Sequence, residues 1–180
     1  MTTITILGIL CLVGLVISMI TALALVEVYE GLRQVRSTVG MLDAPQAVSL
    51  DKAMGKPAVD FGLPPKPVAY VLLFLSPKCG TCHTLAQTFH GDVPRGVRIW
   101  ITATDQTTAS RWASDYQLPS STFTFDEDQD LANRIGVSST PVAVVVHRGL
   151  IVRAITVPSR RVLDGLLDEV LLESRREMQS

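Results

Sequence analysis

Two cysteines three positions apart, Cys79 and Cys82, have the residue type and spacing that most directly suggest chemistry. They follow an apolar run, 68–75, which is rich in valine and bounded by prolines and therefore predicts a buried strand. The residues after them predict a helix over 79–89. A thiol at a helix start faces unpaired N–H groups and the positive end of the dipole, and both favour the thiolate. The pair predicts reversible dithiol–disulfide exchange, with Cys79 as nucleophile and Cys82 as resolving thiol.

The histidine after the second cysteine keeps other interpretations open. The run 79–83 satisfies the Cys-x-x-Cys-His signature of covalent haem attachment, which would make the chain an electron carrier. A second axial ligand would then come from Met54, His90, His147 or Met178. A zinc site would need further ligands, and the remaining histidines lie at no zinc-like spacing. A third hypothesis is a tethered interaction module without redox duty. We expect no cofactor and no metal.

Length and composition limit the classes of protein that this chain could be. Its 180 residues suffice for one globular domain and a short appendage. The formal net charge of −1 gives no indication of nucleic acid or of another polyanionic partner. The third cysteine, Cys11, leaves one pair and one outlier, which argues against a framework of structural disulfides.

The first 28 residues predict a transmembrane anchor. No side chain from Thr2 to Val26 is charged, and a helix of that length exceeds the roughly 30 Å hydrocarbon core of a bilayer. A cleaved signal peptide is the alternative, because Ala22-Leu23-Ala24 resembles a cleavage site, but no basic region precedes the apolar run. Cys11 is then a small apolar residue in lipid.

The orientation of the anchor is predicted by two arguments that disagree. Arg33 and Arg36 follow the apolar segment and no basic residue precedes it, so the positive-inside rule places the rest of the chain in the cytoplasm. A membrane-anchored dithiol finds disulfide-bearing substrates on the oxidising side. We expect a single-pass protein of the cell membrane with its catalytic domain outside the cytoplasm.

Residues 29–57 predict a stalk and a linker. Leu25, Val28, Leu32, Val35 and Val39 continue the helical spacing beyond the membrane, which suggests a stalk that could pair with a second copy or lie on the domain. The linker and lead-in, 43–67, contain many prolines and glycines, with one short strand expected at 58–61.

The domain proper, 58–175, alternates predicted strands and helices. After the strand and helix around the cysteines we expect a strand at 97–102, a helix at 107–116, a short strand at 121–125 and a helical turn from 126 to 135. A strand at 142–146 turns through 147–149 into a hairpin partner at 150–157. Ser159 is expected to cap a final amphipathic helix. Trp100 and Trp112 are expected in the core, and His90 and His147 are assigned no role.

A second motif, Thr140-Pro141, opens the strand before the hairpin. Cys-x-x-Cys on the first helix and Thr-Pro before a hairpin together resemble the thioredoxin superfamily. The resemblance implies an α/β thioredoxin-like fold, with a central mixed sheet flanked by helices and preceded here by one N-terminal transmembrane helix. It also implies a cis Thr140–Pro141 bond beside Cys79. Thr140 and Pro141 would then be substrate-binding residues, with the Thr140 backbone bonding a substrate cysteine.

The anchor, the proline-rich lead-in and the run Ser76–Cys82 look like membrane-anchored thiol–disulfide oxidoreductases of the TlpA/ResA kind. Within them, the Ser-Pro-x-Cys-x-x-Cys form is similar to that of the methylamine dehydrogenase accessory proteins. The resemblance implies protein thiols and disulfides as substrates and a transmembrane electron donor that reduces the pair. The direction of the reaction is not implied.

This sequence departs from the family pattern in two ways. Pro77-Lys78 replaces the tryptophan that commonly precedes the first cysteine, and the strand 68–75 holds no buried acid. Lys78 or His83 could influence the thiols instead, or each could be a solvated polar side chain.

Overall fold

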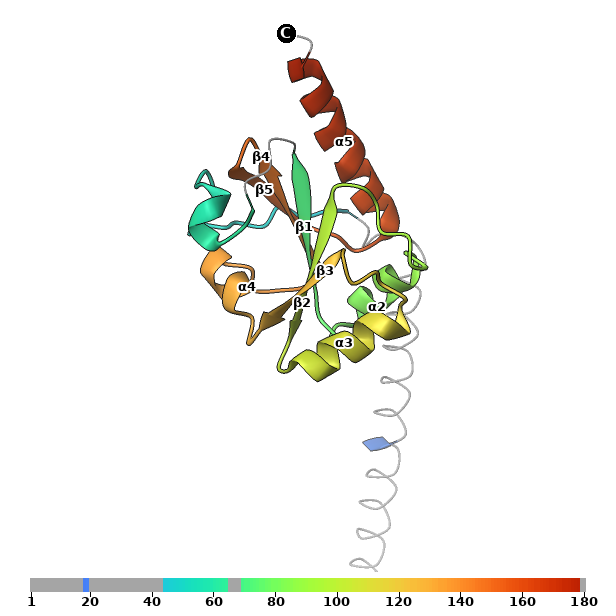
Figure 1. The fold of residues 1–180 in the computed structure, drawn as a ribbon. Helices are drawn as coiled ribbons and strands as arrows, with labels where there is room; N and C mark the ends of the chain where they lie inside the picture. The colour runs from blue at the N-terminus through green and yellow to red at the C-terminus, as the bar shows by residue number, and fades with distance from the viewer. Residues whose placement is uncertain (1–17, 20–43, 65–68, 179–180) are drawn as a thin grey trace, which may run out of the picture. The chain divides into compact units, whose positions relative to one another are not determined.

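Five strands form one mixed sheet at the centre of residues 43–180, in the order β3-β2-β1-β4-β5 (Figure 1). The computed structural model describes residues 18–19, 44–64 and 69–178, with side chains up to 173 in the last helix. The strands are β1 (Tyr70–Leu75), β2 (Val97–Ala103), β3 (Phe123–Glu127), β4 (Val142–His147) and β5 (Leu150–Thr156). β1 pairs parallel with β2 and antiparallel with β4, and β2 pairs parallel with β3.

Helices cover both faces of the sheet (Figure 1). They are α2 (Gly80–Gln87), α3 (Gln106–Asp115), α4 (Asp130–Ile135) and α5 (Arg160–Met178), preceded by a 3₁₀ helix, η1 (Ala58–Phe61). Side chains of β1 alternate between two cores because successive residues of a strand point to opposite faces. Val71, Leu73 and Leu75 pack with α2, α3 and α5, whereas Tyr70, Leu72 and Phe74 pack with α4 and the lead-in. All six residues of β1 are buried, as its apolar run predicts.

The lead-in packs along the outer edge of β5. Ala47 forms a bridge with Ile155, and Pro57 forms one with Leu150. Leu50, Ala53, Ala58 and Leu63 are buried in the core that also contains α4. Residues 44–57, expected from their prolines to be linker, are therefore part of the same compact unit as the sheet, which begins at residue 43.

Three local expectations are wrong. Residues 58–61 form η1 instead of a strand, because Pro57 and the left-handed Gly62 bracket only four residues and Asp60 N–H bonds to Pro57 O. Asp126 and Glu127 belong to β3, and α4 begins only at Asp130. Ser159 does precede α5, but its buried hydroxyl finds no hydrogen-bond partner among the described residues, so it does not cap the helix.

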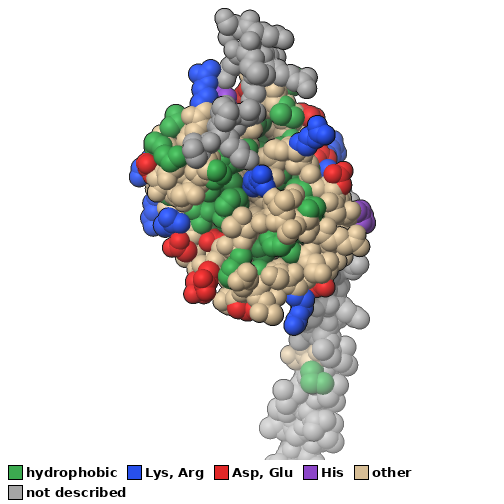
Figure 2. All heavy atoms as spheres, in the orientation of Figure 1, with side chains coloured by type: hydrophobic (Ala, Val, Ile, Leu, Met, Phe, Trp, Pro, Cys, Tyr) green, Lys and Arg blue, Asp and Glu red, His purple; other side chains and the backbone are tan. Residues whose placement is uncertain are grey.

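Most of the predicted anchor, 1–28, lies outside the described residues, which include only 18–19 of it. Residues 29–43 of the predicted stalk and linker also lie outside them. Among residues 18–19, 44–64 and 69–178, no helix is both long and apolar enough to cross a membrane. On the face drawn in Figure 2, acidic and basic side chains are interspersed around the domain, in keeping with the near-zero net charge.

Candidate active site

Cys79 lies at the point where the end of β1 turns into α2. It is the N-cap residue of α2, with extended backbone angles of φ −103° and ψ 113°. The Cys82 N–H donates to Cys79 Sγ at 3.2 Å, so the sulfur takes the place of an N-capping oxygen. This donor favours a negative charge on the sulfur, and so does the helix dipole. The position predicted for the nucleophile is therefore found at a helix start, and its side chain is half-buried.

Thr140 faces the same sulfur from the loop that precedes β4, the strand paired with β1. The Cys79 thiol donates to Thr140 O at 3.2 Å, although the two residues are 61 positions apart. The Thr140–Pro141 bond is cis, as the resemblance implies. Pro141 is buried at the entrance to β4. The fold therefore brings the two sequence motifs into direct contact.

Cys82, the residue predicted to be the resolving thiol, is fully buried at 0 % exposure. Burial, followed by its hydrogen bond with Cys79, raises the pKa of Cys82 to about 12. The first turn of one helix thus presents one accessible thiol with an N–H donor and one dry thiol held neutral. That asymmetry suits a nucleophile followed by a resolving thiol.

Two small clefts flank the segment before Cys79. One, of about 110 Å³, is lined by Pro77, Lys78, Thr104, Thr108 and Asp128, among others. The other, of about 70 Å³, runs along the loop 137–140 that ends at the cis bond. Ser76, Thr102 and Gln129 line both clefts. Both walls carry hydroxyl and amide groups, which can bond to an extended polypeptide backbone.

Three carbonyls of the segment that leads to Cys79, those of residues 75–77, have hydrogen-bond partners. Leu75 O accepts from Thr102 Oγ1 at 3.1 Å, Ser76 O accepts from Cys79 N at 3.1 Å, and Pro77 O lies 2.7 Å from His83 Nε2. His83 Nδ1 in turn lies 2.5 Å from the Tyr116 hydroxyl and 3.3 Å from Trp112 Nε1. Sequence reasoning assigned Trp112 to the core, where it is, but it missed this contact. Lys78, in contrast, is exposed.

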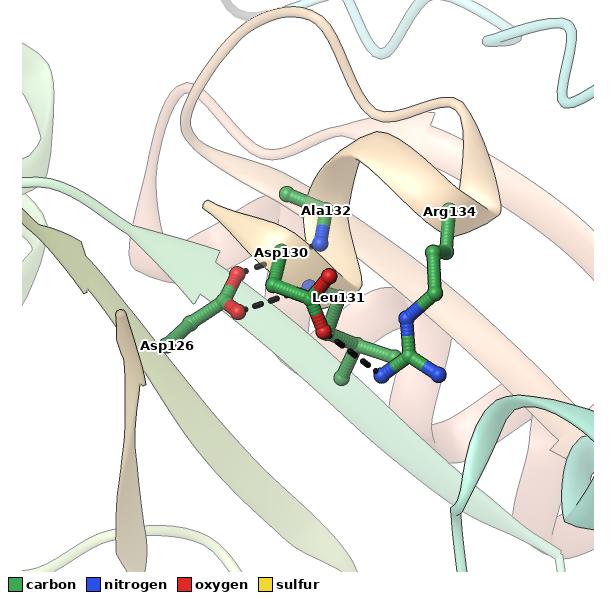
Figure 3. A network of polar contacts seen from close by, with 5 residues as sticks. All are labelled: Asp126, Asp130, Leu131, Ala132 and Arg134. Atoms are coloured by element: carbon green, nitrogen blue, oxygen red, sulfur yellow. Dashed lines mark hydrogen bonds and ion pairs between the residues drawn. The ribbon is translucent and has the colours of Figure 1, made fainter. Parts of the chain in front are cut away.

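Asp126 is a second residue that sequence reasoning missed. It is the penultimate residue of β3, at 4 % exposure, and its carboxylate accepts from the N–H groups of Leu131 and Ala132 at 2.8 and 3.1 Å (Figure 3). It thereby caps α4, while Asp130 pairs with Arg134 on the exposed side. Burial raises the pKa of Asp126, and the two N–H donors oppose that rise. An acid a few residues before a helix is the signal that could have found it.

The haem interpretation does not fit these residues. Covalent attachment would need both sulfurs and one nitrogen of His83 free for the haem. Cys82 is fully buried, and both ring nitrogens of His83 are engaged by neighbours. Within the described part of the chain, no three His, Cys, Asp or Glu side chains are grouped so that they could hold a metal ion.

No family model and no curated protein matches the chain. Among solved structures it is similar to a secreted Mycobacterium tuberculosis disulfide oxidoreductase homologous to E. coli DsbE, with 18% identity, 63% of this chain and 92% of the other covered, and a TM-score of 0.48. It is also similar to the thioredoxin domain of a Bacteroides vulgatus thiol-disulfide oxidoreductase, with 15% identity, 66% of this chain and 98% of the other covered, and a TM-score of 0.47. A third similar structure is StoA from Bacillus subtilis, with 16% identity, 51% of this chain and 75% of the other covered, and a TM-score of 0.40. Similarity at this level does not establish a shared activity.

Proposed function

We propose that the chain is a membrane-anchored thiol–disulfide oxidoreductase that exchanges disulfides with protein substrates outside the cytoplasm. The observation that carries the proposal is the position of Cys79 Sγ, held between the Cys82 N–H and the Thr140 carbonyl at 3.2 Å each. In this position the Cys79 sulfur accepts from an N–H donor that favours the thiolate, and it lies next to the Cys82 thiol on the same helical turn. Thr140 O is the group to which a bound substrate backbone would come close.

In the reducing direction, the Cys79 thiolate attacks one sulfur of a substrate disulfide. A mixed disulfide forms, and the first substrate sulfur leaves as a thiolate. Cys82 then loses its proton and attacks Cys79 Sγ, which releases the second substrate thiolate and leaves a Cys79–Cys82 disulfide. Two electrons pass to the substrate, whose thiolates take up two protons. Oxidation of a dithiol substrate is the reverse sequence.

The raised pKa of Cys82 assigns the two thiols to different steps. A thiol with a pKa of about 12 is a poor nucleophile at neutral pH, so Cys82 does not compete for the substrate. It reacts when the mixed disulfide holds Cys79 Sγ against it, because proximity then offsets its low thiolate fraction. A transmembrane dithiol donor would return the pair to the reduced state.

The test uses the full-length chain and a model protein disulfide. Cys79→Ser should abolish exchange, and Cys82→Ser should accumulate a mixed disulfide that a reductant releases. Cys11→Ser is the matched control and should exchange at the wild-type rate. Retained activity of Cys79→Ser would refute the assignment. A folded wild-type protein that exchanges no disulfide would favour the interaction module.

The membrane topology has its own test. We propose residues 1–28 as the anchor and 29–43 as the stalk, ahead of a thioredoxin-like domain that includes the lead-in 44–57. In a chain carrying Cys11→Ser, a membrane-impermeant maleimide should label Cys79 in intact cells. Labelling that requires permeabilised cells would place the domain in the cytoplasm, as the positive-inside rule predicts.

Two finer proposals rest on the sequence pattern. The spacing of Leu25, Val28, Leu32, Val35 and Val39 would allow two stalks to pair, and removing 29–43 should then convert a dimer to a monomer in sedimentation. The kinship with methylamine dehydrogenase accessory proteins rests on the Ser-Pro-x-Cys-x-x-Cys form.

A further inference from the structure

We propose that His83 is a positioning residue for Cys79, and that its contacts with α3 adjust the reactivity of the Cys79 thiol. The inference rests on the proposed function for its biological meaning, but it concerns a measurable property of the cysteine pair itself. Among the hydrogen bonds of the described residues, none joins the His83 ring to either sulfur. It acts through the segment Ser76–Lys78, which leads into the nucleophile.

The hydrogen bonds around His83 fix which ring nitrogen carries the proton. Pro77 O can only accept, so Nε2, at 2.7 Å, carries the hydrogen. The indole N–H of Trp112 can only donate, so Nδ1, at 3.3 Å, carries none. The Tyr116 hydroxyl then also donates to Nδ1, at 2.5 Å. The two contacts together fix the tautomer that carries its hydrogen on Nε2.

α3 holds the ring in the orientation that reaches Pro77. The rings of Trp112 and Tyr116 lie 5.8 and 5.6 Å from that of His83, and both meet it edge-on. The same two rings pack on each other at 4.9 Å, and Trp112 is only 5 % exposed. Helices α2 and α3 lie side by side in Figure 1. Buried Trp112 of α3 and the half-buried C-cap residue Tyr116 are thus connected through His83 to the backbone of the Cys79 loop.

The connection reaches the sulfur through the backbone of the N-cap. Cys79 accepts the Cys82 N–H only because its extended backbone turns Sγ back over the first turn of α2. That backbone conformation follows from the preceding segment, whose first two carbonyls, Ser76 O and Pro77 O, are held by Cys79 N–H and by His83. Without the His83 donor, the Pro77 carbonyl is free to rotate toward water and the N-cap loosens. The thiolate of Cys79 then loses part of the donor that stabilises it.

The test compares three substitutions in the full-length chain. His83→Gln keeps a donor at the position of Nε2, whereas His83→Asn reaches only the position of Nδ1, and His83→Leu has neither. Thr84→Ala is the matched control, since Thr84 is exposed on the same helix and bonds only to Gly80 O. The rate of Cys79 alkylation at neutral pH and the equilibrium of the Cys79–Cys82 pair with glutathione are measured on folded protein.

We expect His83→Asn and His83→Leu to slow alkylation by about three- to tenfold, the size expected when a capping hydrogen bond to an anion is loosened. Weaker stabilisation of the thiolate also destabilises the reduced form, so the glutathione equilibrium shifts toward the disulfide, by at most about 30 mV for a tenfold loss of thiolate stability. His83→Gln and Thr84→Ala should match the wild type.

Two results would overturn the proposal. One is an alkylation rate in His83→Asn equal to that of the wild type. This variant alone decides the outcome if His83→Leu does not fold. The other is equal slowing in the Gln and Asn variants, which would mean that His83 is only a structural contact between α2 and α3. Failure of the proposed function looks different: the wild type would exchange no protein disulfide, while these alkylation rates would still separate the Gln and Asn variants.

Discussion

Raising the pH should destabilise the reduced protein through Cys82. Burial sets the pKa of this thiol at about 12 in the folded state, whereas a thiol in an unfolded chain has a pKa of about 8.5. Between these two values the folded chain holds a proton that the unfolded chain has released. The contribution of Cys82 to stability is therefore fully present below about pH 8.5 and is lost progressively as the pH rises toward the folded value.

The size of the effect follows from one proton released on unfolding. Each pH unit inside the window lowers the free energy of unfolding by about 1.4 kcal/mol. Between pH 8 and 10 the loss is about 2 kcal/mol, a substantial part of the roughly 5–15 kcal/mol that stabilises a typical domain. Burial also raises the pKa of Tyr70, so ionisation of this residue in the unfolded chain also lowers the free energy of unfolding at the upper end of the pH range. A comparison with a variant that lacks only the Cys82 thiol separates the two groups.

The assay is chemical denaturation of the full-length chain in mild detergent and a phosphine reductant, at pH 8 and at pH 10. Cys82→Ala leaves a small cavity, and that cost does not depend on pH. The cost of the substitution should therefore shrink by about 2 kcal/mol between the two conditions. Thr84→Ala, at an exposed residue of the same helix that does not titrate, is the control and should keep the wild-type slope. A cost of Cys82→Ala that is the same at both pH values would refute the reasoning from burial.

Three further substitutions test the described packing and polar contacts by the same denaturation measurement. Phe74→Ala should cost about 3–5 kcal/mol because Phe74 is fully buried, and a cost below about 1 kcal/mol would contradict its placement. Asp126→Ala should cost about 1–3 kcal/mol because two buried N–H groups at the start of α4 lose their acceptor, and an unchanged midpoint would argue against the cap. Glu169→Ala should cost less than about 1 kcal/mol, vanishing in high salt, because its 2.8 Å pair with Arg153 is half exposed.

The elements around Cys79 could be predicted because their sequence signals are strong and local. β1 is a continuous apolar run, and all six of its residues are buried. The hairpin turn places Arg148 and Gly149 at positive φ, a conformation that glycine adopts readily and that suits a two-residue turn. The strand at 58–61 failed because apolar residues beside a proline and a glycine suit a short 3₁₀ turn as well as a strand, and Val59 is exposed.

The site was only partly predictable. That Cys79 begins a helix follows from its neighbours in sequence, but its contact with Thr140, 61 residues away, came from a resemblance to known proteins. The contact of His83 with α3 has no sequence signal, since nothing in the spacing of His83, Trp112 and Tyr116 requires two helices to meet there. Asp126 was read as the start of a helix because acids favour helix N-termini, and in the fold it caps α4 from the end of β3.

The lead-in has a consequence for how the domain behaves among copies of itself. An uncovered outer strand offers unpaired N–H and C=O groups to any passing chain and is a template for intermolecular pairing. Here Val48 N–H bonds to Ala154 O at 2.9 Å and Gly55 N–H to Ile151 O at 2.8 Å, so part of that template is already occupied by the molecule's own backbone. Residues 44–57 therefore cover part of the β5 edge and reduce its availability for pairing between molecules. Such a covered edge strand limits association between domains that are held at high local concentration.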